Sequence, residues 1–446
     1  IGLGIPAEPL FRSTFVEEHK RKIDLIKKVR EKLNIPLAIM LDTKGPEYRI
    51  GTFADEKVTV CDGDCFTFTT AEIVGDSSRV SVNYKELPKN LSVGDKILVN
   101  NGLVIFKVES LTEQDVHCRV VAGGILSNRK SMCFPNKVMT GPYLSGQDKA
   151  DLQFGIDQNV DFVAASFVST KEDALEVRNF LNERGGEDID IIAKIENRSG
   201  VDNIDEICEA CEGIMIARGD LGVEIPFVEV PAVQKMLISK CRLLGKRVIT
   251  ATEMLESMIQ NPRPTRAEIS DVANGVYDGS SAVMLSGESA AGKYPVEAVC
   301  NMAQIVEFTE QHTSYRKRFY NTEFRIRNNL DAISHATCSM AIDVNAKCIV
   351  VCSASGRTAR MVSRFRCPVD IIGMTTVKKA WHKLALSWGV TPILAREFSS
   401  MDVMFFHAVE SAKRCFELSP GDNVVLTGGP INGKTGNTNT IKVEAI

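Results

Sequence analysis

Six short apolar runs alternate with segments of helical periodicity in this sequence. Within each run the Val, Ile, Ala and Met residues are continuous rather than alternating with polar ones, which is typical of strands buried on both faces. Repeated strand–helix units predict a parallel sheet covered by helices. The runs span residues 37–41, 162–167, 189–195, 213–217, 247–251 and 282–286.

The six strand–helix units are two fewer than a closed (β/α)8 barrel requires. The residues before Pro36 have room for only one helix, at 15–33. The pattern therefore leaves two architectures open: an open sheet, or a (β/α)8 TIM barrel whose first two strands are incomplete in this sequence.

Residues 48–135 depart from this rhythm. Strand-like runs lie close together, Gly and Asp separate them, and we expect no helix among them. This predicts a small all-β domain inserted after a barrel strand, suited to act as a lid. A second strand–helix series predicts a C-terminal open α/β domain. The expected division is 1–47 with 136–325 for the barrel, 48–135 for the lid and 326–446 for the C-terminal domain.

Composition excludes several classes of protein. The 446 residues are 44% hydrophobic and 25% charged, as in ordinary globular proteins, and a net charge of −4 argues against general nucleic-acid binding. No apolar run reaches the ~18–20 residues that span a bilayer, and the first residues lack a secretory pattern. An odd count of 13 Cys, several within apolar runs, favours reduced thiols and a cytoplasmic location.

Polar residues follow each predicted strand, at the end where barrel active sites collect. Lys194 and Glu196 close the run IDIIAKIE, and alternation along a strand places them on the same side. Buried charges are costly unless they are paired. We expect these two residues to pair with one another, with Asp220, and with a metal and an anion between them. The other polar strand ends are Asp42-Thr43-Lys44, Ser166, Arg218-Gly219-Asp220, Thr252-Glu253 and Ser286-Gly287-Glu288.

This residue set predicts a chemistry. Two carboxylates from adjacent strands offer the oxygen ligands that Mg²⁺ or Mn²⁺ prefers. A nearby ammonium suits a phosphate or a developing oxyanion. Together they predict phosphoryl transfer or enolate chemistry. The alternative is that strand-end charges are solvated loop residues with no role.

At these residues the chain resembles the pyruvate kinase family. The shared motifs occur in family order, and the inserted and C-terminal domains lie where that family has them. The resemblance implies phosphoryl transfer from phosphoenolpyruvate to ADP, giving pyruvate and ATP in glycolysis. The motifs are LDTKGPEYRIG (41–51), DKADLQFGIDQNVDFVAASFV (148–168), IIAKIENRSG (191–200), GIMIARGDLGVEIP (213–226), ITATEMLESM (249–258) and NPRPTRAEISDVANGVYDGSSAVMLSGESAAGKYPVEAV (261–299).

The resemblance also implies residue roles and cofactors, Mg²⁺ (or Mn²⁺) and K⁺. Lys194 resembles the catalytic Lys, and Thr252 lies near the place where the enolate is protonated. The remaining implied roles are substrate binding by Lys194, Gly219, Asp220 and Thr252, Mg²⁺ binding by Glu196 and Asp220, half of a K⁺ site at Asp42 and Thr43, K⁺ dependence signalled by Glu47, and nucleotide binding by Lys130.

A loop of the C-terminal domain, SASGRT, has the composition of a phosphate cradle. Hydroxyls, a Gly and an Arg precede an expected helix. The resemblance implies an allosteric site there for a sugar phosphate or AMP, with a Gly-rich loop at 428–435 closing over it, and a homotetramer. A plain helix cap is the alternative. The implied effector residues are Ser353, Ser355, Gly356, Arg357 and Thr358.

The chain also departs from the family pattern. Motifs of the types T-I-G-P and R-x-N-x-S-H-G are not in the sequence, and Arg12 and Ser13 cannot be given their roles. Three hypotheses follow: an active Mg²⁺- and K⁺-dependent pyruvate kinase, which we favour; a barrel aldolase that forms a Schiff base on Lys194; and a non-catalytic protein that binds phosphorylated metabolites.

Overall fold

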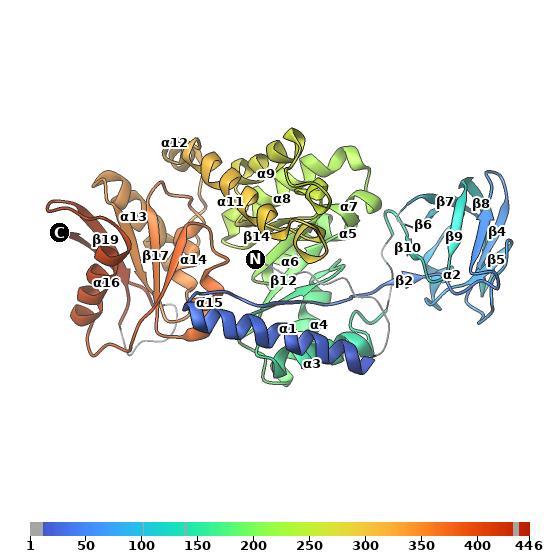
Figure 1. Ribbon diagram of the computed structural model, residues 1–446, viewed down its shortest axis with the longest axis horizontal. Helices are drawn as coiled ribbons and strands as arrows, with labels where there is room; N and C mark the ends of the chain where they lie inside the picture. The colour runs from blue at the N-terminus through green and yellow to red at the C-terminus, as the bar shows by residue number, and fades with distance from the viewer. Residues whose placement is uncertain (1–11, 101, 138, 140, 431–436) are drawn as a thin grey trace.

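The computed structural model describes residues 12–100, 102–137, 139, 141–430 and 437–446, with residues 12–15 described by their backbone only. It contains a six-stranded, a seven-stranded and a five-stranded sheet, and one two-stranded ribbon. Figure 1 shows the six-stranded sheet and its helices in the middle, the strands of the inserted residues on the right and the C-terminal sheet on the left. Among the described residues no helix is long and apolar enough to span a membrane.

The six apolar runs form the six-stranded sheet in chain order. Every neighbouring pair is parallel, and strand ends on one side carry the polar residues noted above. The strands are β1 (Met40–Asp42), β11 (Phe162–Ala165), β12 (Asp190–Ile195), β13 (Gly213–Ala217), β14 (Arg247–Ala251) and β15 (Ala282–Val283). Strands β11, β13 and β14 are buried at every residue, as their continuous apolar sequence predicts.

Helices on the outer face complete the strand–helix units. Ser145, Thr170 and Thr265 each begin a helix with a capping box, in which the side chain accepts a hydrogen bond from the third helical N–H. The helices and turns of this region are α1 (Arg12–Leu33), α3 (Gly146–Asp157), α4 (Lys171–Glu183), α5 (Arg198–Asp202), α6 (Ile204–Ala210), α7 (Arg218–Glu224), η1 (Phe227–Glu229), α8 (Val230–Leu244), η2 (Glu256–Ile259), α9 (Arg266–Asp278), α10 (Gly287–Ala290), α11 (Pro295–Gln311) and α12 (Tyr315–Asn321).

The inserted residues form an all-β unit around a core of aromatic rings. Phe66, Phe68 and Phe106 are at most 1% exposed, and their ring centroids lie 4.9–5.4 Å apart. The prediction of no helix there is wrong at one turn, α2 (Leu87–Asn90), which Pro88 favours by its fixed φ. The strands are β2 (Tyr48–Arg49), β3 (Lys57–Val60), β4 (Cys65–Thr69), β5 (Arg79–Ser81), β6 (Lys96–Val99), β7 (Val104–Leu111), β8 (Asp115–Ala122), β9 (Gly124–Ser127) and β10 (Ser131–Cys133).

The C-terminal sheet has the order β18-β17-β16-β19-β20. Its four parallel strands agree with the predicted strand–helix series, whereas the antiparallel edge strand β20 was not predicted. The elements are α13 (Asn329–Asp343), β16 (Cys348–Cys352), α14 (Arg357–Ser363), β17 (Asp370–Thr375), α15 (Lys378–Leu384), β18 (Val390–Leu394), α16 (Met401–Cys415), β19 (Asn423–Gly428) and β20 (Thr440–Ala445).

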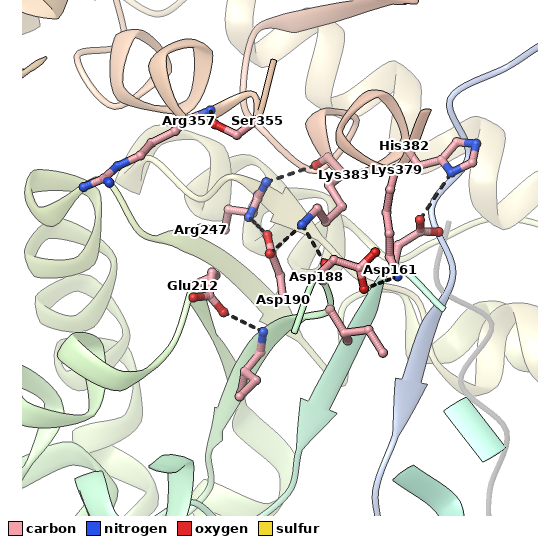
Figure 2. A network of polar contacts seen from close by, with 12 residues as sticks. Asp161, Asp188, Asp190, Glu212, Arg247, Ser355, Arg357, Lys379, His382 and Lys383 are labelled. Carbon is pink, nitrogen blue, oxygen red and sulfur yellow. Dashed lines mark hydrogen bonds and ion pairs between the residues drawn. The ribbon is translucent and has the colours of Figure 1, made fainter. Parts of the chain in front are cut away.

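Helix α15 binds the amino-terminal ends of the six-stranded sheet through ion pairs (Figure 2). Lys383 Nζ lies 2.7 Å from Asp190 Oδ1, and Arg247 Nη1 lies 2.8 Å from Asp190 Oδ2. Lys379 Nζ lies 2.8 Å from Asp188 Oδ1. This charged junction therefore fixes the C-terminal sheet to the face opposite the polar strand ends.

Candidate active site at the carboxyl ends of the sheet

Lys194 and Glu196 lie together where β12 ends. The Lys194 ammonium is 3.2 Å from Glu196 Oε1, which confirms the pairing expected from their spacing. It also lies 3.2 Å from Asp42 Oδ1, and it donates a hydrogen bond of 2.7 Å to Ser166 Oγ. We expected Asp220 as the second anionic partner; Asp42 takes that place because β1 and β12 flank the same strand, β11. We call Asp42, Ser166, Lys194, Glu196 and Asp220 the rim cluster.

Glu196 is the most buried member of the rim cluster, at 1% exposed. Its Oε2 accepts a hydrogen bond of 2.6 Å from the Phe167 backbone N–H. Its Oε1 faces the Lys194 ammonium but has no partner in hydrogen-bonding geometry among the described residues. Burial raises the pKa of Glu196 to about 7, and the charge of Asp220 adds to this effect while Lys194 opposes it. A nearby cation would stabilise the charged form of this buried carboxylate.

Lys194 stays a cation in this environment. Burial disfavours its charge, but the carboxylates of Glu196 and Asp42 outweigh burial and raise the pKa of Lys194 above its ordinary value. A protonated ammonium stabilises negative charge on a ligand but cannot attack a carbonyl carbon.

Asp220 lies in the first turn of α7, directly after β13. Its side chain is exposed, and it makes no hydrogen bond or ion pair in the part of the chain that the structure describes. Its charge affects the pKa of both Glu196 and Asp42, so the three carboxylates share one region of the rim. The adjacent Gly219 donates its backbone N–H to Thr252 Oγ1 at 2.8 Å.

Thr252 follows β14 in a strained conformation. Thr252 and Glu253 have φ angles of 68° and 53°, a region that non-glycine residues rarely adopt. The Arg218 guanidinium holds this turn: its Nη2 donates to Thr252 O at 2.6 Å and to Glu253 O at 3.1 Å. Arg218 Nη1 is anchored in turn by Asp271 at 2.8 Å. Arg218, which follows β13, therefore fixes the position of Thr252, which follows β14.

The rim cluster fits a divalent cation bound jointly with a ligand. No group of three Asp, Glu, His or Cys residues able to hold a metal by themselves occurs among the described residues. However, the buried Oε1 of Glu196 is paired only with the Lys194 ammonium and has no hydrogen-bond partner among the described residues, and the Asp220 side chain is exposed. Two such oxygen donors match Mg²⁺, which usually keeps only one or two protein carboxylates and completes its shell with substrate and water.

The residues expected at a K⁺ site have other contacts in this structure. Thr43 is 4% exposed, and its carbonyl accepts a hydrogen bond of 2.7 Å from Ser166 Oγ. Asp42 pairs with Lys194, as described above. Glu47 forms ion pairs with Lys44 and Arg49.

Lys130 lies outside the rim cluster. It precedes β10 in the inserted unit, and no ion pair joins its ammonium to the rim within the described ranges. Figure 1 shows the strands of this unit beside the six-stranded sheet, connected through β2 and β10.

The predicted effector loop joins β16 to α14. Gly356 has a φ of 72°, which its lack of a side chain permits, and Arg357 is exposed. Thr358 Oγ1 lies 2.7 Å from Thr438 Oγ1, so the segment after the Gly-rich loop packs against this loop. Asn432, Gly433, Lys434 and Thr435 lie outside the described residues.

Sequence reasoning assigned no role to Ser166 or Arg218. Both occur at predicted strand ends, which is the signal that could have selected them. Their partners come from neighbouring strands, so their function depends on strand order and not on local sequence.

Comparison with known proteins identifies related chains. The family model described as "Pyruvate kinase, barrel domain" matches residues 11–299, and "Pyruvate kinase, alpha/beta domain" matches residues 331–444. A pyruvate kinase of Clostridium acetobutylicum is 46% identical, with 96% of this chain and 91% of that protein covered. One of Geobacillus stearothermophilus is 44% identical, covering 96% and 74%.

A solved structure is also similar. A crystal structure of a pyruvate kinase from Cryptosporidium parvum matches with a TM-score of 0.91 and 34% identity, covering 96% of this chain and 88% of that one.

Proposed function

The chain belongs to the pyruvate kinase family, and we propose that the rim cluster is its catalytic centre. It is a phosphotransferase, and the reaction transfers the phosphoryl group of phosphoenolpyruvate to ADP, giving pyruvate and ATP in glycolysis. The observation that carries the proposal is the convergence of a buried Lys194 ammonium with Glu196, whose Oε1 lacks a hydrogen-bond partner, and with Asp220 nearby.

The metal requirement rests on the two carboxylates. Glu196 and Asp220 would hold Mg²⁺ or Mn²⁺, and the ion would supply positive charge to substrate carboxylate and phosphoryl oxygens. Asp42 and Thr43 would provide half of the K⁺ site. Burial of the Glu196 carboxylate is costly and only partly offset by Lys194, so a divalent cation bound beside it would stabilise its charged form further.

Lys194 would neutralise charge as the bond between phosphorus and the enol oxygen breaks. Its ammonium is fixed by three side chains, so little reorganisation is needed when negative charge develops. The backbone groups of Gly219 and Asp220, in the first turn of α7, would orient the substrate carboxylate together with Thr252, whose Oγ1 accepts the Gly219 N–H in this structure. Transfer of the phosphoryl group to ADP leaves an enolate of pyruvate.

Thr252 would lie beside the carbon that receives a proton in the last step. The proton adds to the terminal carbon of the enolate and completes pyruvate. Lys130, carried by the inserted unit, would bind nucleotide phosphates once that unit closes over the rim and excludes water.

The loop at residues 353–358 is proposed as the regulatory site. Ser353, Ser355, Gly356, Arg357 and Thr358 would bind the phosphate of a sugar phosphate or AMP. Titration calorimetry with each compound should detect binding that Arg357→Gln abolishes; equal binding by that variant would reject the assignment.

Assembly and location are also proposals. We expect a homotetramer, which sedimentation of the purified chain would show as four times the chain mass. All 13 cysteines are free, which supports a reducing, cytoplasmic environment.

The raised pKa of Lys194 argues against an aldolase. A Schiff base requires a neutral amine, whereas Glu196 and Asp42 keep this lysine protonated. Trapping with borohydride and a keto acid should therefore leave Lys194 unmodified.

Replacing Lys194 tests the proposed function. Pyruvate formation from phosphoenolpyruvate and ADP should fall at least ~10³-fold in Lys194→Met, because one full charge at the transferring phosphoryl is lost. Lys347→Met is the matched control, since Lys347 is half-exposed in the C-terminal domain. Wild-type turnover by Lys194→Met would reject the catalytic assignment, and no turnover by the wild-type chain would favour the non-catalytic alternative.

A further inference from the structure

A small cavity lies between the barrel helices and the C-terminal domain, at the end of the sheet opposite the rim cluster. Its volume is ≈ 10 Å³. Six of its lining residues are cationic, and none of the described lining residues is acidic. We call it the arginine cavity; it is lined by Arg242, Gly245, Lys246, Arg247, Ser281, Arg360, Ser363, Arg364, Arg366, Ser387 and Trp388.

The arginines of this cavity are withdrawn from water. Arg242, Arg247, Arg364 and Arg366 are 8%, 5%, 4% and 3% exposed. Removing a charged group from water costs several kcal/mol unless a counter-charge and hydrogen bonds compensate. Because these cations surround one cavity, their burial requires negative charge in or beside that cavity.

The described carboxylates supply only part of that charge. Arg247 pairs with Asp190 at 2.8 Å, and Arg364 lies 3.4 Å from Asp331. Arg242, Arg360 and Arg366 form no ion pair within the described ranges. The charges of Asp190 and Glu212 act on the pKa of Arg360 without direct pairing, and Glu310 acts in the same way on Arg366. Arg242 is on α8, Arg360 is on α14, and Arg366 lies in the segment that follows α14.

Several buried hydrogen-bond donors around the cavity have no acceptor among the described residues. Part of the donor set is used: Arg366 donates to Gly279 O at 2.9 Å, and Arg364 donates to Leu243 O at 3.1 Å. The buried atoms without a hydrogen-bond or ion-pair partner in the described structure are Arg242 Nε and Nη1, Arg247 Nε, Arg360 Nε, Arg364 Nε, Arg366 Nε and Ser387 Oγ. Buried polar atoms are rarely left unpaired, so this concentration points to a missing acceptor.

Burial, and to a smaller extent mutual repulsion, lowers the pKa values of the same groups. Burial first, and then the neighbouring Arg318, lowers the pKa of Arg242 to about 10. Burial and Arg242 lower the pKa of Arg366 to about 9. Both groups still carry a proton at neutral pH, so the positive charge persists.

We propose that the arginine cavity binds one small inorganic anion of the size of chloride. A space of this volume is at the lower limit for one water-sized particle, so chloride would enter with a small outward shift of the walls, whereas phosphate or sulfate would require a larger one. The anion would accept hydrogen bonds from α8 and α14 at once and so join the barrel to the C-terminal domain. This site is separate from the proposed catalytic and effector residues.

Thermal unfolding of the full chain tests the proposal. Chloride replaces gluconate stepwise at constant ionic strength, because gluconate is too large to enter. The melting temperature of the wild type should rise with the logarithm of chloride concentration. Arg242→Gln should reduce this slope by at least about twofold, since it removes one uncompensated charge and breaks no hydrogen bond that the described structure contains. Its melting temperature in gluconate should not fall below that of the wild type.

Arg396→Gln is the control, because this arginine of the C-terminal domain is exposed, and it should keep the wild-type slope. Arg360→Gln provides a second test with the same expected loss. Crystals soaked in bromide should show an anomalous peak inside the cavity. Equal melting temperatures in chloride and gluconate, an unchanged slope in Arg242→Gln, or no bromide peak would overturn the proposal. A larger stabilisation by phosphate than by chloride would overturn the assigned size.

Discussion

Arg218→Lys isolates the part that a planar guanidinium plays in holding the turn at Thr252. Arg218 reaches the carbonyls of Thr252 and Glu253 and also Asp271. Lysine keeps the positive charge, but its single ammonium cannot replace a fork of donors. The substitution therefore changes geometry and leaves the charge of the site unchanged.

The magnitude follows from the strain of that turn. Two consecutive residues with positive φ cost ~1–3 kcal/mol each, and hydrogen bonds from a charged donor contribute ~1.5–3 kcal/mol each. Losing one or two of these bonds removes about 3 kcal/mol, enough for the turn to relax. Thr252 Oγ1 now accepts a hydrogen bond of 2.8 Å from the Gly219 N–H, and this bond would then be lost.

Steady-state kinetics of pyruvate formation measure the consequence. About 3 kcal/mol corresponds to a fall in kcat of about 100-fold, while the KM for ADP should stay within about threefold because the proposed nucleotide-binding residue, Lys130, lies in the inserted unit. Arg178→Lys is the control, since Arg178 also donates to a backbone carbonyl, that of Ile189, at the opposite end of the sheet. A kcat of Arg218→Lys within twofold of the wild type would refute the positioning role.

Further predictions concern the ion pairs of Asp190 at the junction of the domains and the hydrogen bond between Ser166 and Lys194. Asp190→Asn should lower the free energy of unfolding by about 3 kcal/mol, because Arg247 and Lys383 lose a buried partner; a thermal melt measures this. Burial opposes ionisation of Asp190, but Arg247 and Lys383 lower its pKa. Its ion pairs therefore stabilise the fold above about pH 4, and this contribution disappears as pH falls further. The melting curves of wild type and Asp190→Asn should converge in acid, and a gap that stays constant contradicts the argument. Ser166→Ala should lower kcat about tenfold by removing the 2.7 Å partner of Lys194; unchanged kcat would show that the ion pairs alone hold the ammonium.

The parts of the fold that depend on local pattern were predictable from the sequence. Continuous apolar runs identified β11, β13 and β14, which are buried at every residue. The edge strand β20 was missed because it is half-exposed and antiparallel, so its residues lack such a run. The segment after β12 forms two helices, α5 and α6, which are divided at Asn203, the residue that caps both of them.

The candidate site was predictable in part for a similar reason. Alternation along one strand placed Lys194 beside Glu196, and this required no knowledge of other strands. The pairing of Lys194 with Asp42 joins residues 152 positions apart and depends on strand order. The positive φ of Thr252 had no signal in the sequence, because a glycine would normally mark such a position.

Binding of Mn²⁺ to the full chain, measured by titration calorimetry with phosphoenolpyruvate present, tests the central claim most directly. The wild type should bind the ion, and Glu196→Gln and Asp220→Asn should each weaken binding at least about tenfold, whereas Glu297→Gln, an exposed acid on α11, should bind like the wild type. Wild-type affinity in both rim variants would contradict the assignment of Glu196 and Asp220 as the metal ligands.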